Sequence, residues 1–136
     1  MTSRSIAVSI ICLCAPIAAC GDTLGSAPCP GDSVTVVVTT SPIGLPPQFS
    51  WSPPCPMGEI SVDGASSAAN MWLIVTTDSN RVLPPLRYGQ VPAGMQQLSS
   101  AQRLAPGAVY TVSVWRWVSG NPNPLFRRAS VVSFVP

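Results

Sequence analysis

Short runs of β-branched and aromatic residues, each bounded by turn residues, are the feature that most constrains this chain. The sequence holds 16 prolines and 10 glycines in 136 residues, and many of them separate these runs from one another. Runs of this length and composition are typical of β-strands. No segment has the apolar spacing of an amphipathic helix. The sequence therefore predicts an all-β domain.

The predicted strands alternate with turns from residue 33 to the end of the sequence. They cover residues 33–40, 48–52, 59–62, 71–77, 108–118 and 129–134, with short edge strands at 86–88 and 96–98. Residues 71–77 are almost continuously apolar, which predicts a central strand covered on both faces. Residues 108–118 are predicted as the longest strand, and residues 119–124 as the loop of its hairpin.

Residues 81–103 are the least regular part of the predicted domain. Pro84, Pro85 and Pro92 exclude a long helix and a central strand there. At most, a single helical turn is predicted at residues 99–104. The strand topology of residues 81–103 stays open. About seven short strands separated by turns predict one antiparallel β-sandwich over residues 33–136.

Two segments resemble strands of fibronectin type III domains. Residues 104–114 read LAPGAVYTVSV, which is similar to the pattern Leu-x-Pro-Gly-x-x-Tyr-x-Val-x-Val of the sixth strand. Residues 49–53 read FSWSP and resemble the second strand, with its buried tryptophan and following proline. The resemblance implies a fibronectin type III-like or immunoglobulin-like sandwich. It also implies that the Tyr110 hydroxyl hydrogen-bonds to backbone upstream in the sequence.

The first twenty residues have the composition of an export signal. Arg4 precedes an apolar run over residues 6–19, and small residues follow at its end. The sequence Ile17-Ala18-Ala19-Cys20 resembles the lipobox of bacterial lipoproteins. The resemblance implies cleavage before Cys20, attachment of lipid to its sulfur, and acylation (by palmitate, for example) of the new amino group.

Two other interpretations of the N-terminal run stay open. A membrane-spanning helix needs about 20 apolar residues, whereas this run is shorter and contains Pro16. An ordinary cleaved signal is the other alternative. We expect a lipoprotein signal peptide at residues 1–19, and a lipidated cysteine with a flexible tether at residues 20–32. The protein would then be exported and anchored by lipid to the cell membrane or the outer membrane.

The cysteines agree with export. Cys12 and Cys14 would leave with the signal peptide, and Cys20 would carry lipid. Cys29 and Cys55 then remain as a pair in a compartment where disulfides persist. The prediction is a Cys29–Cys55 disulfide, and the alternative is two buried thiols that act as small apolar side chains.

The composition argues against several classes of function. The chain has no histidine, so Ser-His-Asp and Cys-His sites and the usual zinc sites are excluded. Glu59, Asp63 and Asp78 are scattered, and turn formation accounts for them better than paired catalytic carboxylates or a calcium loop. Charged residues make up 9% of the sequence, with a net charge of +2, which does not favour nucleic-acid binding. We expect no enzyme activity, catalytic residue, cofactor or metal.

Two tryptophans near the end of the predicted strand 108–118 form the candidate binding surface. If Tyr110 faces the core, alternation places Trp115 and Trp117 on the outside, with Arg116 between them in sequence. Leu73 and Val75 would extend the same surface if they point the same way. The alternative is that a neighbouring strand or residues 81–92 cover the two indoles.

Two hypotheses for the function follow. The first is an envelope lipoprotein whose sandwich is a non-enzymatic binding or structural module with an unknown envelope protein as partner, because Trp and Arg are enriched in binding hot spots. The second is a carbohydrate-binding module that stacks glycan rings on Trp115 and Trp117. In both, the lipid on Cys20 attaches the chain to a membrane.

Overall fold

The structure, a computed structural model, describes residues 29, 33–40, 45–65, 70–118 and 125–136. The predicted signal peptide, Cys20, the tether apart from Cys29, and the predicted loop at residues 119–124 lie outside the described residues. The described residues form eight strands and no helix. The strands are β1 (Thr35–Thr39), β2 (Gln48–Ser52), β3 (Glu59–Gly64), β4 (Asn70–Val75), β5 (Leu86–Arg87), β6 (Gln96–Ser99), β7 (Tyr110–Val118) and β8 (Leu125–Phe134).

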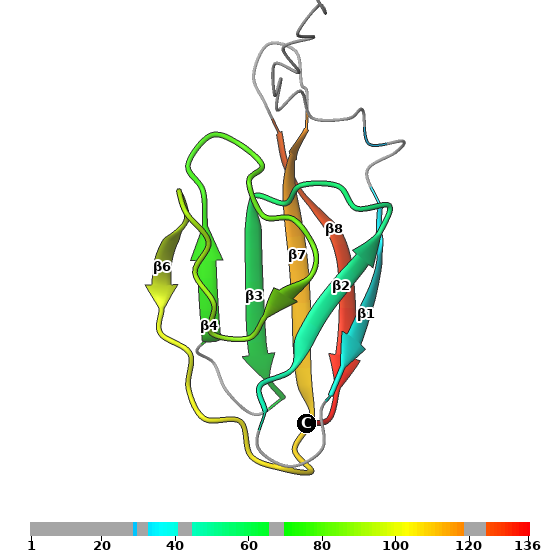
Figure 1. The fold of residues 1–136 in the computed structure, drawn as a ribbon, viewed down its shortest axis with the longest axis vertical. Coiled ribbons are helices and arrows are strands. Elements are labelled where there is room, and N and C mark those ends of the chain that lie inside the picture. The colour runs from blue at the N-terminus through cyan, green and yellow to red at the C-terminus, as the bar shows by residue number, and fades with distance from the viewer. Residues whose placement is uncertain (1–28, 30–32, 41–44, 66–69, 119–124) are drawn as a thin grey trace, which may run out of the picture.

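The strands form two antiparallel sheets that pack face to face (Figure 1). One sheet has the strand order β1-β2-β5, and the other has the order β6-β4-β3-β7-β8. The predicted antiparallel β-sandwich is therefore confirmed at the level of its architecture. The short strands β5 and β6 lie at sheet edges, as predicted. Prolines precede both of them in the sequence, and proline is tolerated at an edge because its missing N–H breaks no ladder there.

The core lies between the two sheets and is built largely from alternate residues of the strands other than β6. Phe49 of β2 packs against Trp72 of β4 and Phe134 of β8, with ring centroids 6.4 Å and 5.7 Å apart. The largest fully buried side chains are those of Trp72, Phe49, Met57, Ile60, Ile74, Leu86, Val62, Val82, Val112 and Val114. Burial of each such side chain contributes about 1.5–3 kcal/mol relative to exposure, so this layer is the main source of stability.

A β-bulge in β8 joins the two sheets along one side. Val114 pairs with Ser130 and Trp115 pairs with Arg128, so Ala129 is an extra residue in β8. Its carbonyl accepts a hydrogen bond from the Val34 N–H, just before β1, at 3.2 Å. A bulge bends its strand and disrupts the local ladder. Here it lets β8 bond to the neighbouring sheet as well as to β7.

The proline-rich segment 81–92 contributes to the core. Val82, Leu86 and Tyr88 are all buried, and Met57 pairs with Val82 as an isolated bridge. The Tyr88 ring packs edge-on against Trp72 at 5.4 Å. Its hydroxyl lies 3.0 Å from the Met71 carbonyl oxygen and 2.9 Å from that of Gln102. Side chains of this segment therefore fill part of the core between the two sheets.

Three sequence predictions about the strands were wrong. β4 is not covered on both faces: Trp72 and Ile74 are buried, whereas Leu73 and Val75 are only half-buried on the opposite face. Residues 99–104 contain no helical turn, because the Gln102 N–H bonds to the Met71 carbonyl instead. β8, with 10 residues, is longer than β7, with 9. The first four residues of β8, LFRR, do not alternate between apolar and polar, yet pairing with β7 holds them in the strand.

Tyr110 forms the hydrogen bond expected of it. The Ala105 N–H donates to the Tyr110 hydroxyl at 2.8 Å, five residues upstream. Gly107, in the intervening turn, has φ = 79°, a conformation that glycine adopts without strain. Buried tyrosines usually satisfy the polar end of the ring in this way.

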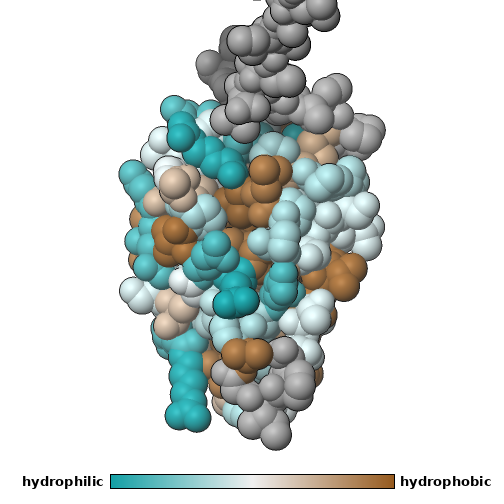
Figure 2. Space-filling model, viewed as in Figure 1, coloured by the Kyte–Doolittle hydropathy of each residue, from teal (hydrophilic) through white to brown (hydrophobic). Residues whose placement is uncertain are grey.

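On the side of the molecule in Figure 2, teal and white residues separate the brown patches.

Candidate binding surface

The outer face of the five-stranded sheet carries Trp115 and Trp117. Along β7, Tyr110, Val112 and Val114 are buried toward the core, and no residue is inserted in β7 where it pairs with β3. Alternation is therefore unbroken, and the structure places both indoles on the outer face, where each is partly exposed.

An aromatic cluster from β7 and β8 forms this part of the face. Phe126 pairs directly with Trp117, with ring centroids 4.7 Å apart, and stacks on Trp115 at 5.6 Å. We call Trp115, Trp117 and Phe126 the aromatic cluster. The Arg128 guanidinium lies 5.4 Å from the centre of the Trp115 ring, which is within cation–π range. Sequence reasoning missed Phe126 and Arg128, because only the cross-strand register reveals them. Residues 125–128 read LFRR, which has no polar–apolar alternation, so the sequence holds no strand signal there.

Arg116 does not belong to this surface. It follows the inward alternation of β7, its side chain is 8% exposed, and its cross-strand neighbour is Arg127. The sequence predicted a candidate surface of Trp115, Arg116 and Trp117. The inclusion of Arg116 was wrong, because its side chain lies on the inner side of β7. Neighbours in a strand point to opposite faces, so the cation near Trp115 comes from the adjacent strand, as Arg128.

The apolar surface continues across the sheet. Leu73 pairs with Ser61, which pairs with Ser113, so Leu73 is on the same outer face as the aromatic cluster. Val75 lies on the same face, because it pairs with Glu59, which in turn pairs with Trp115. At the other side, Val131 is 49% exposed opposite Ser113. The outer apolar surface, made of Leu73, Val75, Trp115, Trp117, Phe126 and Val131, thus extends from β4 to β8.

One row of residues crosses the middle of this surface. Glu59 of β3 and Arg128 of β8 are the two cross-strand neighbours of Trp115, one on each side of β7. Burial raises the pKa of Glu59 above the ordinary value of 4.5, and the nearby charge of Asp63 raises it further. No described residue forms an ion pair with Glu59. Because of the cross-strand pairing, a carboxylate on β3 and a guanidinium on β8 flank Trp115.

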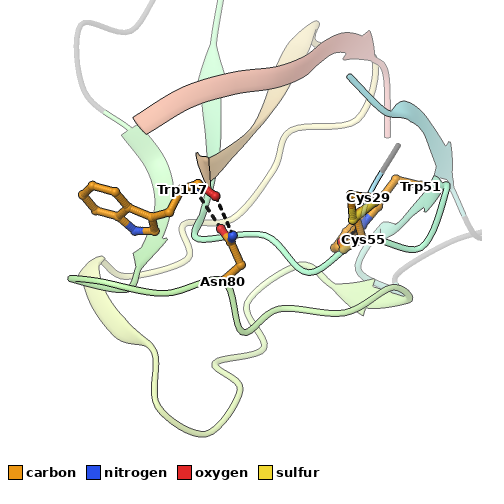
Figure 3. The surroundings of a disulfide bond; sticks show 5 residues. All are labelled: Cys29, Trp51, Cys55, Asn80 and Trp117. Atoms are coloured by element: carbon orange, nitrogen blue, oxygen red, sulfur yellow. Dashed lines mark hydrogen bonds between the residues drawn. A yellow bond between two sulfur atoms is a disulfide. The ribbon is translucent and has the colours of Figure 1, made fainter. Parts of the chain in front are cut away.

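The end of β7 that carries Trp117 is positioned by Asn80 and Gly58. The Asn80 side chain donates to the Trp117 carbonyl at 2.7 Å and accepts from the Trp117 N–H at 2.8 Å. In Figure 3 the indole extends away from this pair of bonds. A Cβ on Gly58 would lie 2.8 Å from Trp117 Cδ1, so the ring packs on a site where only glycine fits. Within residues 81–92, Val82, Leu86 and Tyr88 are core residues. The neighbouring strand β8 covers part of both indoles through Phe126, and the Trp117 Nε1 atom is buried.

Cys29 and Cys55 are close together, in agreement with the predicted disulfide. Their sulfur atoms are 2.06 Å apart and their Cα atoms 5.7 Å apart (Figure 3). The Trp51 indole N–H donates to the Cys55 carbonyl at 2.6 Å. The bridge links the segment before β1 to the segment after β2, so it holds both ends of the β1–β2 hairpin.

The described acidic residues lie at two places in the fold. Glu59 and Asp63 share the outer face of β3, and Asp78 lies in the turn after β4, where it accepts a hydrogen bond from the Ser79 hydroxyl. Within the described ranges, no three histidine, cysteine or acidic side chains come together as metal ligands. In the same ranges there is no helix of the length and apolarity needed to cross a bilayer.

Comparison of the chain with models of protein families, with curated protein sequences and with solved structures finds no match.

Proposed function

We propose that this protein is an envelope lipoprotein, anchored through lipid on Cys20, whose β-sandwich is a non-enzymatic binding module. The observation that carries the proposal is the partly exposed aromatic cluster of Trp115, Trp117 and Phe126, with Arg128 against it. Tryptophan and arginine are the residues most enriched where binding energy concentrates. The lipobox-like sequence at residues 17–20 supports the anchor.

The sandwich is proposed to be of the fibronectin type III-like or immunoglobulin-like kind. Two observations support this: the Tyr110 hydroxyl bonds to backbone upstream, and Trp51 is buried in the second strand. Domains of these kinds serve many unrelated roles, so the fold alone assigns no activity.

The packing of the cluster favours a protein partner. Phe126 stacks on Trp115 with an interplanar angle of 11°, and Arg128 also lies against that ring. A sugar platform needs an indole with a free face, whereas here neighbours occupy ring surface. A rigid, mutually packed aromatic group with apolar residues around it is typical of the centre of a protein interface.

A carbohydrate-binding module is the second candidate. The presence of Glu59 and Arg128 beside Trp115 favours it, because charged side chains commonly supply hydrogen bonds to sugar hydroxyls. Binding of the purified protein to a glycan array distinguishes the two. Glycan binding that is lost with Trp115→Thr would support the second candidate over the first.

Cross-linking in intact cells tests the proposal. The full chain and its Trp115→Thr variant are compared, and we expect the variant to lose the cross-linked product. Val37→Thr is the matched control, because Val37 is an apolar residue, 56% exposed, on a strand of the other sheet. Equal cross-linking by all three proteins would contradict the proposed binding role of this surface.

A further inference from the structure

Glu59 and Arg128 are placed symmetrically about β7. Each is the direct cross-strand neighbour of Trp115, on β3 and β8 respectively. Strands in a sheet are about 4.8 Å apart, so the backbone positions of Glu59 and Arg128 lie at about equal distances on either side of Trp115. The outer apolar surface therefore has a charge pattern that changes sign across a line parallel to β7.

A pattern of this kind is complementary to a second copy of itself. When two identical faces are brought together by a two-fold axis parallel to β7, β3 of one copy lies opposite β8 of the other. Glu59 of each chain then faces Arg128 of its mate, and Trp115 faces Trp115. A two-fold interface pairs residue i with j and j with i, which is what this row provides.

We propose that the partner bound by this surface is a second copy of this chain, packed outer face to outer face about that axis. The inference rests on the proposed binding role of the aromatic cluster and specifies its partner. The other in-plane axis, perpendicular to the strands, would place Glu59 against Glu59 and Arg128 against Arg128. Like charges facing each other disfavour that arrangement.

Within the described ranges, neither charge of this row forms an ion pair. No described residue forms an ion pair with Glu59, and the interaction recorded for Arg128 is with the Trp115 ring. Burial already raises the pKa of Glu59, so this carboxylate has lost part of its hydration without a compensating cation. A facing guanidinium would supply that cation and favour the ionised form.

The size of the surface predicts a weak dimer. Five strands about 4.8 Å apart, with about 3.3 Å per residue over the six residues of β3, present a face of roughly 500 Å² per copy. Stable complexes bury about 800 Å² per partner. Attachment of both copies to one membrane would raise their effective concentration and offset the small area.

Charge exchange in the full chain tests this inference. Two differently tagged copies are expressed together, and capture of one is followed by measurement of the other. We expect Glu59→Arg alone and Arg128→Glu alone to reduce self-capture about tenfold or more. The double variant E59R/R128E restores it, and so does expression of an E59R copy with an R128E copy. Asp78→Arg is the control, since it makes the same reversal of charge in the turn after β4, outside the row.

The outcomes separate this inference from the proposed function. Failure of the double variant to recover, with its thermal unfolding unchanged, would overturn the two-fold arrangement. If a reversed charge prevents folding, Glu59→Gln replaces Glu59→Arg, because it removes the charge with little change in shape. We expect Glu59→Gln to reduce self-capture as well. Suppose instead that the wild-type protein captures no second copy of itself, while Trp115→Thr still loses a cross-link to another protein or to a glycan. That result would reject the dimer and leave the proposed binding surface standing. If Trp115→Thr changes neither readout, both proposals are wrong.

Discussion

The side-chain amide of Asn80 pairs with both backbone groups of Trp117, 37 residues later in the sequence. The two hydrogen bonds measure 2.7 Å and 2.8 Å. β3 pairs with β7 only as far as Glu59 and Trp115, whereas β7 continues to Val118. Asn80 thus occupies the next position that a strand would have taken. The turn after β4 therefore holds the end of β7 that carries the aromatic cluster.

Asn80→Ala is expected to lower the free energy of unfolding by about 1–3 kcal/mol, because it leaves the N–H and carbonyl of Trp117 without their partner. Asn80→Asp keeps an acceptor for the Trp117 N–H and loses the donor to the Trp117 carbonyl. Its free energy of unfolding should therefore lie between those of the wild type and Asn80→Ala. Urea unfolding measures both effects. An unchanged midpoint in Asn80→Ala would show that the pair contributes nothing to stability.

Gly58→Ala is expected to destabilise the fold by about 1–3 kcal/mol through overpacking. The added methyl would lie 2.8 Å from Trp117 Cδ1 and 3.2 Å from Asn80 Oδ1, so the indole has to move. Gly107→Ala separates this effect from backbone strain, because Gly107 has φ = 79° and open space around it. Tryptophan fluorescence should shift in Gly58→Ala and stay constant in Gly107→Ala. A shift in neither would argue that Trp117 does not pack on Gly58.

The Cys29–Cys55 bridge is expected to stabilise the domain by about 3.5 kcal/mol, since it closes a loop with a sequence separation of 26 residues. Replacement of both cysteines by serine removes this contribution, and reduction of the wild-type protein should have the same effect. Mass spectrometry without reductant is the direct test. Two thiols that alkylate in the native protein would support the alternative of buried free thiols.

Stability is expected to fall between pH 10 and pH 12 because of Tyr88. Burial raises the pKa of Tyr88 from 10.0 to about 12. The unfolded chain therefore loses this proton before the folded chain does, and the contribution is complete below pH 10 and lost as pH rises through 12. Tyr88→Phe should flatten this part of the pH profile of unfolding, whereas Tyr110→Phe keeps Tyr88 and should retain it. Identical slopes in the wild type and Tyr88→Phe would contradict the assignment.

Cys20→Ser is expected to release the protein from the membrane fraction and to block cleavage of the predicted signal peptide. The reason is that stable anchoring needs two or more acyl chains, and the Cys20 thiol would carry them. Fractionation of cells and the mass of the protein measure both effects. Cys14→Ser is a suitable control, since it changes a cysteine within the predicted signal peptide and leaves both Cys20 and the Cys29–Cys55 bridge in place. Normal membrane retention of Cys20→Ser would exclude the anchor.

Local patterns predicted much of the fold. Runs of β-branched or aromatic residues predicted the places of β1, β2, β3 and β7, and alternation from Tyr110 predicted that Trp115 and Trp117 share the outer face of β7. These predictions succeeded because a strand side chain points up or down according to its position alone. The prolines before β5 and β6 likewise indicated edge strands through the chemistry of a single residue type.

Only the tertiary structure decided which side chains meet. The pairing of β8 with β7 brings Phe126 and Arg128 to Trp115, and the turn at Asn80 reaches Trp117 across 37 residues. A period of two says which face a residue occupies, but strand order and register depend on packing between distant segments. For the same reason, the apolar run of β4 was read as covered on both faces. Composition reports that a side chain is apolar, and only the neighbouring layers determine whether each face of its strand is covered.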